Sequence, residues 1–172
     1  EGDGAAIYDL ASRLSDGRGV TRDLTVGAKL FEKLAAAGYA PAQYKIAGQY
    51  EKGLGLTRDL AQAKLWYGRA AEQGNIRSMH NLAVIFAENP SATGKPDFAT
   101  AAQWFRRGAE HGVRDSQYNL AVLYESGLGA PKDLQEAYKW FTIASRSGDK
   151  ESRRRIELVR QKLTPAEINV AD

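Results

Sequence analysis

The sequence contains no cysteine and only two histidines among its 172 residues. Without thiols, the chain can form no disulfide, no thiolate metal site and no cysteine nucleophile. Two histidines are too few for a multi-histidine metal site within one chain. The longest unbroken apolar run, Leu82–Ala87, is far too short to span a bilayer as a helix.

A strong excess of charge of one sign is also missing. Lys and Arg together number 24 against 21 Asp and Glu, so the net charge is +3. Residues of both signs are interspersed along most of the chain, whereas a nucleic-acid-binding protein concentrates its cations on one face. We therefore predict no nucleic-acid partner. The 43% of hydrophobic residues is ordinary for a folded globular chain and argues against wholesale disorder.

A repeat with a period of 36 to 38 residues organises the chain. The residues that keep this spacing include Gly38, Gly74, Gly112 and Gly148, and Trp66, Trp104 and Trp140. Four copies follow, at about residues 6–41, 42–77, 78–115 and 116–148. A fixed period in this range predicts a solenoid of stacked supersecondary units.

Each copy is predicted to form two helices joined by a turn. The sixth position of every copy is a small residue that lets a neighbouring helix approach closely. These residues are Ala11, Ala47, Ala83 and Ala121. Three copies then have a Gly-x-Gly turn, because glycine adopts the positive φ that a sharp helix–helix turn needs. An aspartate is placed to cap the second helix in every copy, namely Asp23, Asp59, Asp97 and Asp133. Gln62 lies three residues after Asp59, and Glu136 lies three residues after Asp133. This spacing predicts a capping box at each of these two helix starts.

These features together identify a family resemblance. The pattern Ala-x-x-x-(Leu/Ile)-(Ala/Gly)-x-x-Tyr-x-x-Gly-x-Gly-(Val/Leu)-x-x-Asp-x-x-x-Ala-x-x-Trp-x-x-x-Ala-Ala-x-x-Gly resembles the Sel1-like repeat from Ala6 to about Ser152. The resemblance implies an all-α fold, a right-handed α-solenoid of four helix-turn-helix repeats, acting as a non-enzymatic scaffold for protein–protein interaction. The third copy departs from the pattern at residues 89–96, where a loop two residues longer lacks the glycine pair.

The second-helix phrases are also similar to the periplasmic repeat segment of bacterial polar localisation factors such as PodJ. That similarity implies a periplasmic location within an inner-membrane protein, with links to peptidoglycan or the membrane through other parts of the protein. A cytoplasmic location is the alternative.

After the fourth copy, residues 149–163 are predicted to form a capping helix. Ile156, Val159 and Leu163 fall on one side, where they can cover the last apolar face of the solenoid. We interpret the opposite run, Arg153 to Arg155, as a solvated face; an acidic partner is the alternative. Residues 164–172 begin with the pattern of a helix start, Thr-Pro-Ala-Glu. This pattern predicts a further helix and a chain that continues in a longer protein.

No catalytic constellation is present, so we expect no enzyme activity and no cofactor or metal. The glycine pairs lack the third glycine of a dinucleotide loop and the Gly-Lys-Ser/Thr of a phosphate loop. His80 stands at the third position of its copy, where the other copies have Tyr, and is predicted to be a packing aromatic like those tyrosines. His111 falls in the last turn of a second helix, where a cation suits the helix dipole.

The surface predicted to be functional is a concave face lined by the first helices, which would bind peptides or partner domains. Its candidates occupy the fourth and eighth positions of copies two to four. They are Lys45, Gln49, Asn81, Ile85, Asn119 and Leu123. The amides can pair with a peptide backbone and the aliphatics can bury an apolar side chain. A second interpretation, in which Ile85 and Leu123 pack against neighbouring second helices, stays open.

Two other classes of function compete with the scaffold. One is a secreted cell-wall hydrolase or glycan-binding protein, which turnover of peptidoglycan or a β-lactam by the isolated chain would indicate. The other is a cytosolic signalling adaptor, which export of the full-length protein would exclude.

Overall fold

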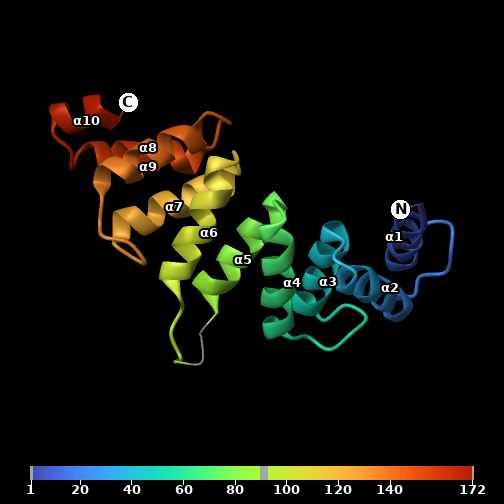
Figure 1. Cartoon of the computed structure of the whole chain (residues 1–172). Helices are drawn as coiled ribbons and strands as arrows, with labels where there is room; N and C mark the ends of the chain where they lie inside the picture. Colours follow the sequence, from blue (N-terminus) through green and yellow to red (C-terminus); the bar gives the residue numbers. More distant parts are fainter. Residues whose placement is uncertain (1, 90–92, 172) are drawn as a thin grey trace. The chain divides into compact units, whose positions relative to one another are not determined.

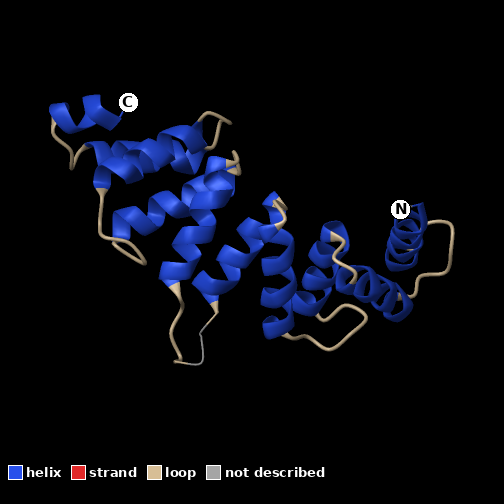
Figure 2. Ribbon diagram, viewed as in Figure 1, coloured by secondary structure: helices blue, strands red, loops and turns tan. Residues whose placement is uncertain are grey.

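The computed structural model describes residues 2–89 and 93–171, and all regular structure within these ranges is helical (Figures 1 and 2). The chain divides into two compact units, Glu1–Ser78 and Met79–Asp172. We call them unit 1 and unit 2. In each copy the first helix ends in a loop that leads to the second helix, as the repeat pattern predicts.

Unit 1 contains two complete helix pairs. Their bounds are α1 (Gly2–Asp16), α2 (Leu24–Ala36), α3 (Ala40–Lys52) and α4 (Leu60–Glu72), and α5 (Ile76–Glu88) begins at the end of this unit. From α1 to α4, each helix packs against the next along the chain. The inner stripe of α4 is buried, and it consists of Ala63, Trp66, Tyr67, Ala70 and Ala71.

Unit 2 contains most of α5, a second full pair and the C-terminal helices. Their bounds are α6 (Phe98–Glu110), α7 (Arg114–Ser126), α8 (Leu134–Ser145), α9 (Lys150–Arg160) and α10 (Pro165–Ala171). In this unit α6 packs on α7, α7 on α8 and α8 on α9, and α10 returns to contact α8. Residues 90–92, within the longer loop predicted for the third copy, lie outside the described residues.

The sixth-position alanines are all completely buried, which confirms their predicted role in close helix packing. Their side chains are 0% exposed in both units: Ala11, Ala47, Ala83 and Ala121. Because the interior is packed at crystal-like density, a larger side chain at these points would push adjacent helices apart.

The four predicted aspartate caps are also confirmed. Each accepts a hydrogen bond from a backbone N–H in the first turn of its helix: Asp23, Asp59, Asp97 and Asp133. In a capping box, the side chain of Gln62 or Glu136 would also accept a hydrogen bond from the backbone N–H of the capping aspartate. That part of the prediction is wrong, because the backbone N–H of Asp133 donates instead to the Tyr124 carbonyl at 3.0 Å. The N–H of Asp59 likewise donates to Tyr50 at 2.9 Å. This bond ties each second helix to the preceding first helix.

The paired turn glycines have the predicted positive φ, and the second of each pair has a further role. At Gly129, where φ is 72°, an added Cβ would lie 2.0 Å from the Phe98 carbonyl oxygen. At Gly55 the distance to the Leu24 carbonyl oxygen would be 2.2 Å. Gly19 also has φ of 72°, but a Cβ there meets nothing within 4 Å. The second glycine therefore lets the turn lie against the preceding second helix where such a helix is present.

Gly19 and Gly129 offer a matched test of this close approach. Gly19→Ala should cost roughly 1–2 kcal/mol of unfolding free energy, the usual cost of a left-handed conformation. Gly129→Ala should cost about 1–3 kcal/mol more, because its Cβ collides with backbone that cannot move freely. Urea unfolding of both variants measures the difference. Equal losses would show that only φ matters at these turns.

The capping helix is confirmed. Val159 of α9 is 0% exposed, and Ile156 and Leu163 pack against the core of unit 2. The predicted start of α10 has a reciprocal capping box, in which the Thr164 N–H donates to the Glu167 carboxylate at 2.7 Å and the Glu167 N–H donates to the Thr164 hydroxyl at 3.3 Å.

The basic run of α9 is not wholly solvated, which corrects our interpretation. Arg153 and Arg154 are exposed, but the guanidinium of Arg155 lies 2.6 Å from the Glu125 carboxylate of α7. It also lies 5.6 Å from the centre of the Phe141 ring of α8. Arg155 therefore binds the capping helix to both helices of the fourth repeat.

The burial of α9 predicts a sharp contrast between adjacent positions. Val159→Ala should lower the free energy of unfolding by about 1–3 kcal/mol, because it leaves a cavity in a closed interface. Leu158→Ala should change it by less than about 0.5 kcal/mol, because that side chain is exposed. Thermal and urea unfolding measure both. A silent Val159→Ala would contradict a closely packed cap.

Candidate functional site

An aromatic ring at the third position of each copy packs against a ring of the second helix of that copy. The ring centres are separated by 5.4 Å for Tyr8–Phe31, 5.9 Å for Tyr44–Tyr67, 5.8 Å for His80–Phe105 and 5.4 Å for Tyr118–Phe141. The prediction that His80 is a packing aromatic is confirmed. All four third-position side chains are only half-buried, so part of each ring stays at the surface.

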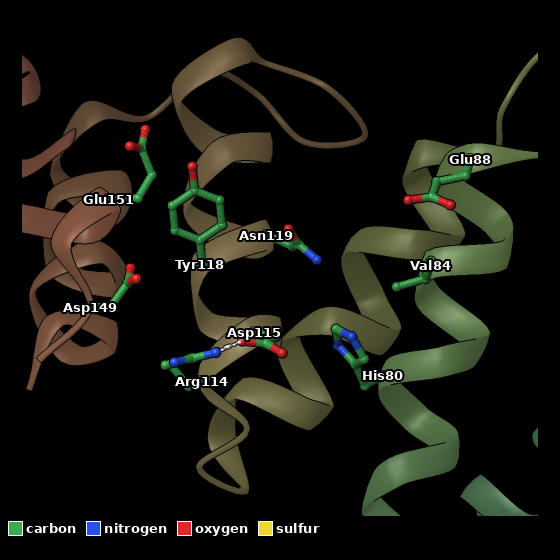
Figure 3. A pocket seen from close by; sticks show the side chains of 9 residues that line it. All are labelled: His80, Val84, Glu88, Arg114, Asp115, Tyr118, Asn119, Asp149 and Glu151. Atoms are coloured by element: carbon green, nitrogen blue, oxygen red, sulfur yellow. Dashed lines mark hydrogen bonds and ion pairs between the residues drawn. The ribbon is translucent and has the colours of Figure 1, made fainter. Parts of the chain in front are cut away.

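In unit 2, the rings of His80 and Tyr118 border a groove of about 440 Å³ on the surface of the first helices (Figure 3). We call it the acidic groove. Three helices contribute its lining residues, with α7 between the other two (Figure 3). They are His80, Val84 and Glu88 from α5, Arg114, Asp115, Tyr118 and Asn119 from α7, and Asp149 and Glu151 at the start of α9.

Carboxylates dominate the electrostatics of the acidic groove. Four carboxylates line it against one guanidinium. That guanidinium, on Arg114, is held by Asp115, with its nitrogens 2.7 and 2.9 Å from the same carboxylate oxygen. Glu151 lies 4.0 Å from the Arg154 guanidinium, which is outside the lining, so Glu88 and Asp149 leave the groove with net negative charge. The Ser152 hydroxyl and N–H both donate to Asp149, which lowers the pKa of that carboxyl and keeps it ionised.

His80 lies at one wall of the groove. Its Nδ1 is 2.9 Å from the Ser116 hydroxyl oxygen. Burial lowers the pKa of His80 below its ordinary value, and the nearby charge of Asp115 opposes this shift in part. Its packed ring and its bond to buried Ser116 make it part of the structure of the wall.

The lowered pKa predicts a pH dependence of stability. Below pH 6.5 His80 binds a proton more readily in the unfolded chain than in the folded chain, so the free energy of unfolding decreases as the pH falls. His80→Tyr, which introduces the residue of the other copies, should remove this decrease. Melting temperatures between pH 7.5 and 5.5 test this, with His111 common to both proteins. The same pH dependence in both would contradict the assignment.

The structure separates the six candidate residues of the predicted binding face. Ile85 and Leu123 are 1% and 5% exposed, and Gln49 is buried as well. These eighth-position side chains therefore pack inside the protein, which corrects the expectation that they contact a partner. Leu123 belongs to the core of unit 2, and the Gln49 side-chain amide donates to the Ser15 hydroxyl at 3.5 Å.

The fourth-position residues have different surroundings. Asn119 lines the acidic groove, whereas half-buried Asn81 is not among its lining residues. Lys45 lines a separate groove in unit 1. The sequence reasoning missed the third, seventh and eleventh positions, which in α5 are His80, Val84 and Glu88. Their i, i+4, i+8 spacing puts them on one helical face and could have revealed them.

The described residues contain no cluster of three His, Asp or Glu side chains that could hold a metal ion. Within residues 2–89 and 93–171, no helix has the length and apolar character that crossing a membrane requires.

Comparison with known proteins identifies the repeat. The Sel1 repeat model matches four consecutive segments, residues 4–39, 40–75, 76–113 and 114–149. The chain belongs to the Sel1 repeat family. Sel1 repeat proteins are in general protein-interaction scaffolds and not enzymes. The family match does not extend to identity with PodJ, and no curated protein matches the chain.

Solved structures have the same architecture. A Sel1 repeat protein from Oxalobacter formigenes is 27% identical with a TM-score of 0.81, over 89% of this chain and 62% of that one. The antigen c5321 of uropathogenic Escherichia coli, which displays an SLR fold, is 29% identical with a TM-score of 0.81, over 98% of this chain and 36% of that one. The cysteine-rich protein HcpB of Helicobacter pylori shares the fold. It is 19% identical with a TM-score of 0.56, over 79% of this chain and 96% of that one. The chain thus spans less than two thirds of the first two proteins.

Proposed function

We propose that this Sel1 repeat chain is a protein-interaction scaffold whose acidic groove binds a basic segment of a partner protein. The observation that carries the proposal is the charge of the groove, where four carboxylates meet one paired arginine. A lysine or arginine side chain of a partner has the opposite charge and a long aliphatic stem.

The walls of the groove suit such a segment. Tyr118 and Val84 offer apolar surface to the stem of a basic side chain, and the tyrosine ring also attracts a cation over its face. Exposed Glu88 and Glu151 stand on opposite sides, on α5 and α9 (Figure 3). The Asn119 amide can bond to a peptide backbone between them. Partner charge therefore determines which segments bind, and the side-chain amide of Asn119 fixes their position.

A cell-wall hydrolase is the competing class, since a groove with several carboxylates is also a place for acid–base chemistry. A general acid in a glycosidase needs a raised pKa. Asp149 has the opposite shift, because it caps α9 through Ser152. This shift makes Asp149 unsuitable as the general acid, and binding of a basic segment is the function that we prefer. Release of soluble fragments from peptidoglycan by the purified chain would reverse that preference.

A narrower proposal concerns the place of action. The similarity of the second helices to the repeats of polar localisation factors supports a periplasmic scaffold at a cell pole. A full-length fusion to alkaline phosphatase, which is active only after export, tests the compartment. An inactive fusion that is stably produced would favour the cytosolic adaptor.

Charge-neutral variants test the acidic groove directly. Glu88→Gln with Glu151→Gln should weaken binding of a fluorescein-labelled hexalysine peptide about five- to tenfold, because each exposed ion pair contributes up to roughly 1 kcal/mol. Fluorescence anisotropy at low salt gives the Kd.

The matched control is Glu110→Gln with Glu157→Gln, which removes two exposed carboxylates of unit 2 outside the groove. It should change the Kd by less than twofold. Equal weakening by both pairs would show that only net charge matters and would refute the groove as the binding site.

A further inference from the structure

Unit 1 has a second groove on its own first helices, with a volume of about 540 Å³. Its lining comes from α1, α3, the turn after α4 and the start of α5. The residues are Tyr8, Pro41, Tyr44, Lys45, Gly74, Asn75, Ile76 and Arg77. We call it the basic groove, because it contains two cations and no carboxylate.

The two cations of the basic groove lie at its surface. Lys45 and Arg77 are both exposed, and among the residues that the structure describes neither has an ion-pair partner. Arg114 in the other groove lies 2.7 Å from a carboxylate oxygen. Both grooves are bordered by third-position rings, but the basic groove carries cations and the acidic groove is dominated by carboxylates.

The remaining walls add apolar contact and hydrogen-bond donors. Tyr8 and Tyr44 are the third-position rings, fixed by their packing on Phe31 and Tyr67. Burial raises the pKa of Tyr8, with a smaller contribution from Tyr39, so its hydroxyl stays protonated and can donate to an anion. Pro41 and Ile76 complete an apolar rim beside the cations.

We infer that the basic groove binds an acidic peptide segment of a partner protein, with Lys45 and Arg77 pairing its carboxylates between the two tyrosine rings. The inference is independent of the acidic groove, because it concerns other residues and a ligand of opposite charge. It assigns a role to Lys45, which the sequence places at a surface position but does not connect with Arg77.

The test uses the full chain and a fluorescein-labelled hexaglutamate peptide, with hexaglutamine as the uncharged probe. Lys45→Gln with Arg77→Gln should weaken hexaglutamate binding about five- to tenfold, as expected for two exposed ion pairs. Hexaglutamine should bind the unmodified chain at least about tenfold more weakly than hexaglutamate, because it forms no ion pair.

A matched pair on the capping helix controls for net charge. Arg153→Gln with Arg154→Gln removes two exposed cations outside the basic groove and should change the Kd by less than twofold. Melting temperatures confirm that all variants fold. The inference is overturned if hexaglutamate does not bind, if both pairs weaken it equally, or if the cap pair alone weakens it, which would move the acidic partner to α9.

Discussion

The close approach of consecutive helix pairs is the constraint on which the rest of this structure depends. A single pair cannot bury its apolar stripe alone, so each repeat is stable only against its neighbours. Small residues make the approach possible: sixth-position alanines at the helix contacts, and Gly55 and Gly129 where a turn meets a backbone carbonyl. The hydrogen bond from each capping aspartate N–H to the preceding helix then fixes how the two helices of a repeat meet.

This packing also determines where a binding surface can form. The third-position rings pack against second-helix aromatics on one side, and on the other side they border a groove. The repeat thus provides rigid walls at fixed intervals, while the remaining lining residues are free to vary. In unit 1 they make a basic groove and in unit 2 an acidic one. The fold provides the scaffold, and our proposals assign the selectivity to the charges of the grooves.

Much of the fold was predictable because repetition multiplies weak local signals. One aspartate before a helix is ambiguous, but four at the same place in four copies predicted the caps that the structure confirms. The errors arose where tertiary contacts decide. The eighth position lies only about 40° further around the helix than the fourth. That angle turns Leu123 into the core while Asn119 stays at the groove. The pairing of Arg155 with Glu125 depends on how α9 meets α7, which no local pattern encodes.

The central claim is that the first-helix surface of unit 2 is where a basic partner segment binds. Chemical-shift mapping of the isotope-labelled chain during titration with hexalysine tests it most directly. The account predicts that the largest backbone amide shifts lie at Val84, Glu88, Tyr118 and Asn119, around the acidic groove. Shifts concentrated instead on the exposed outer faces of α6 and α8, with the groove residues unchanged, would contradict it.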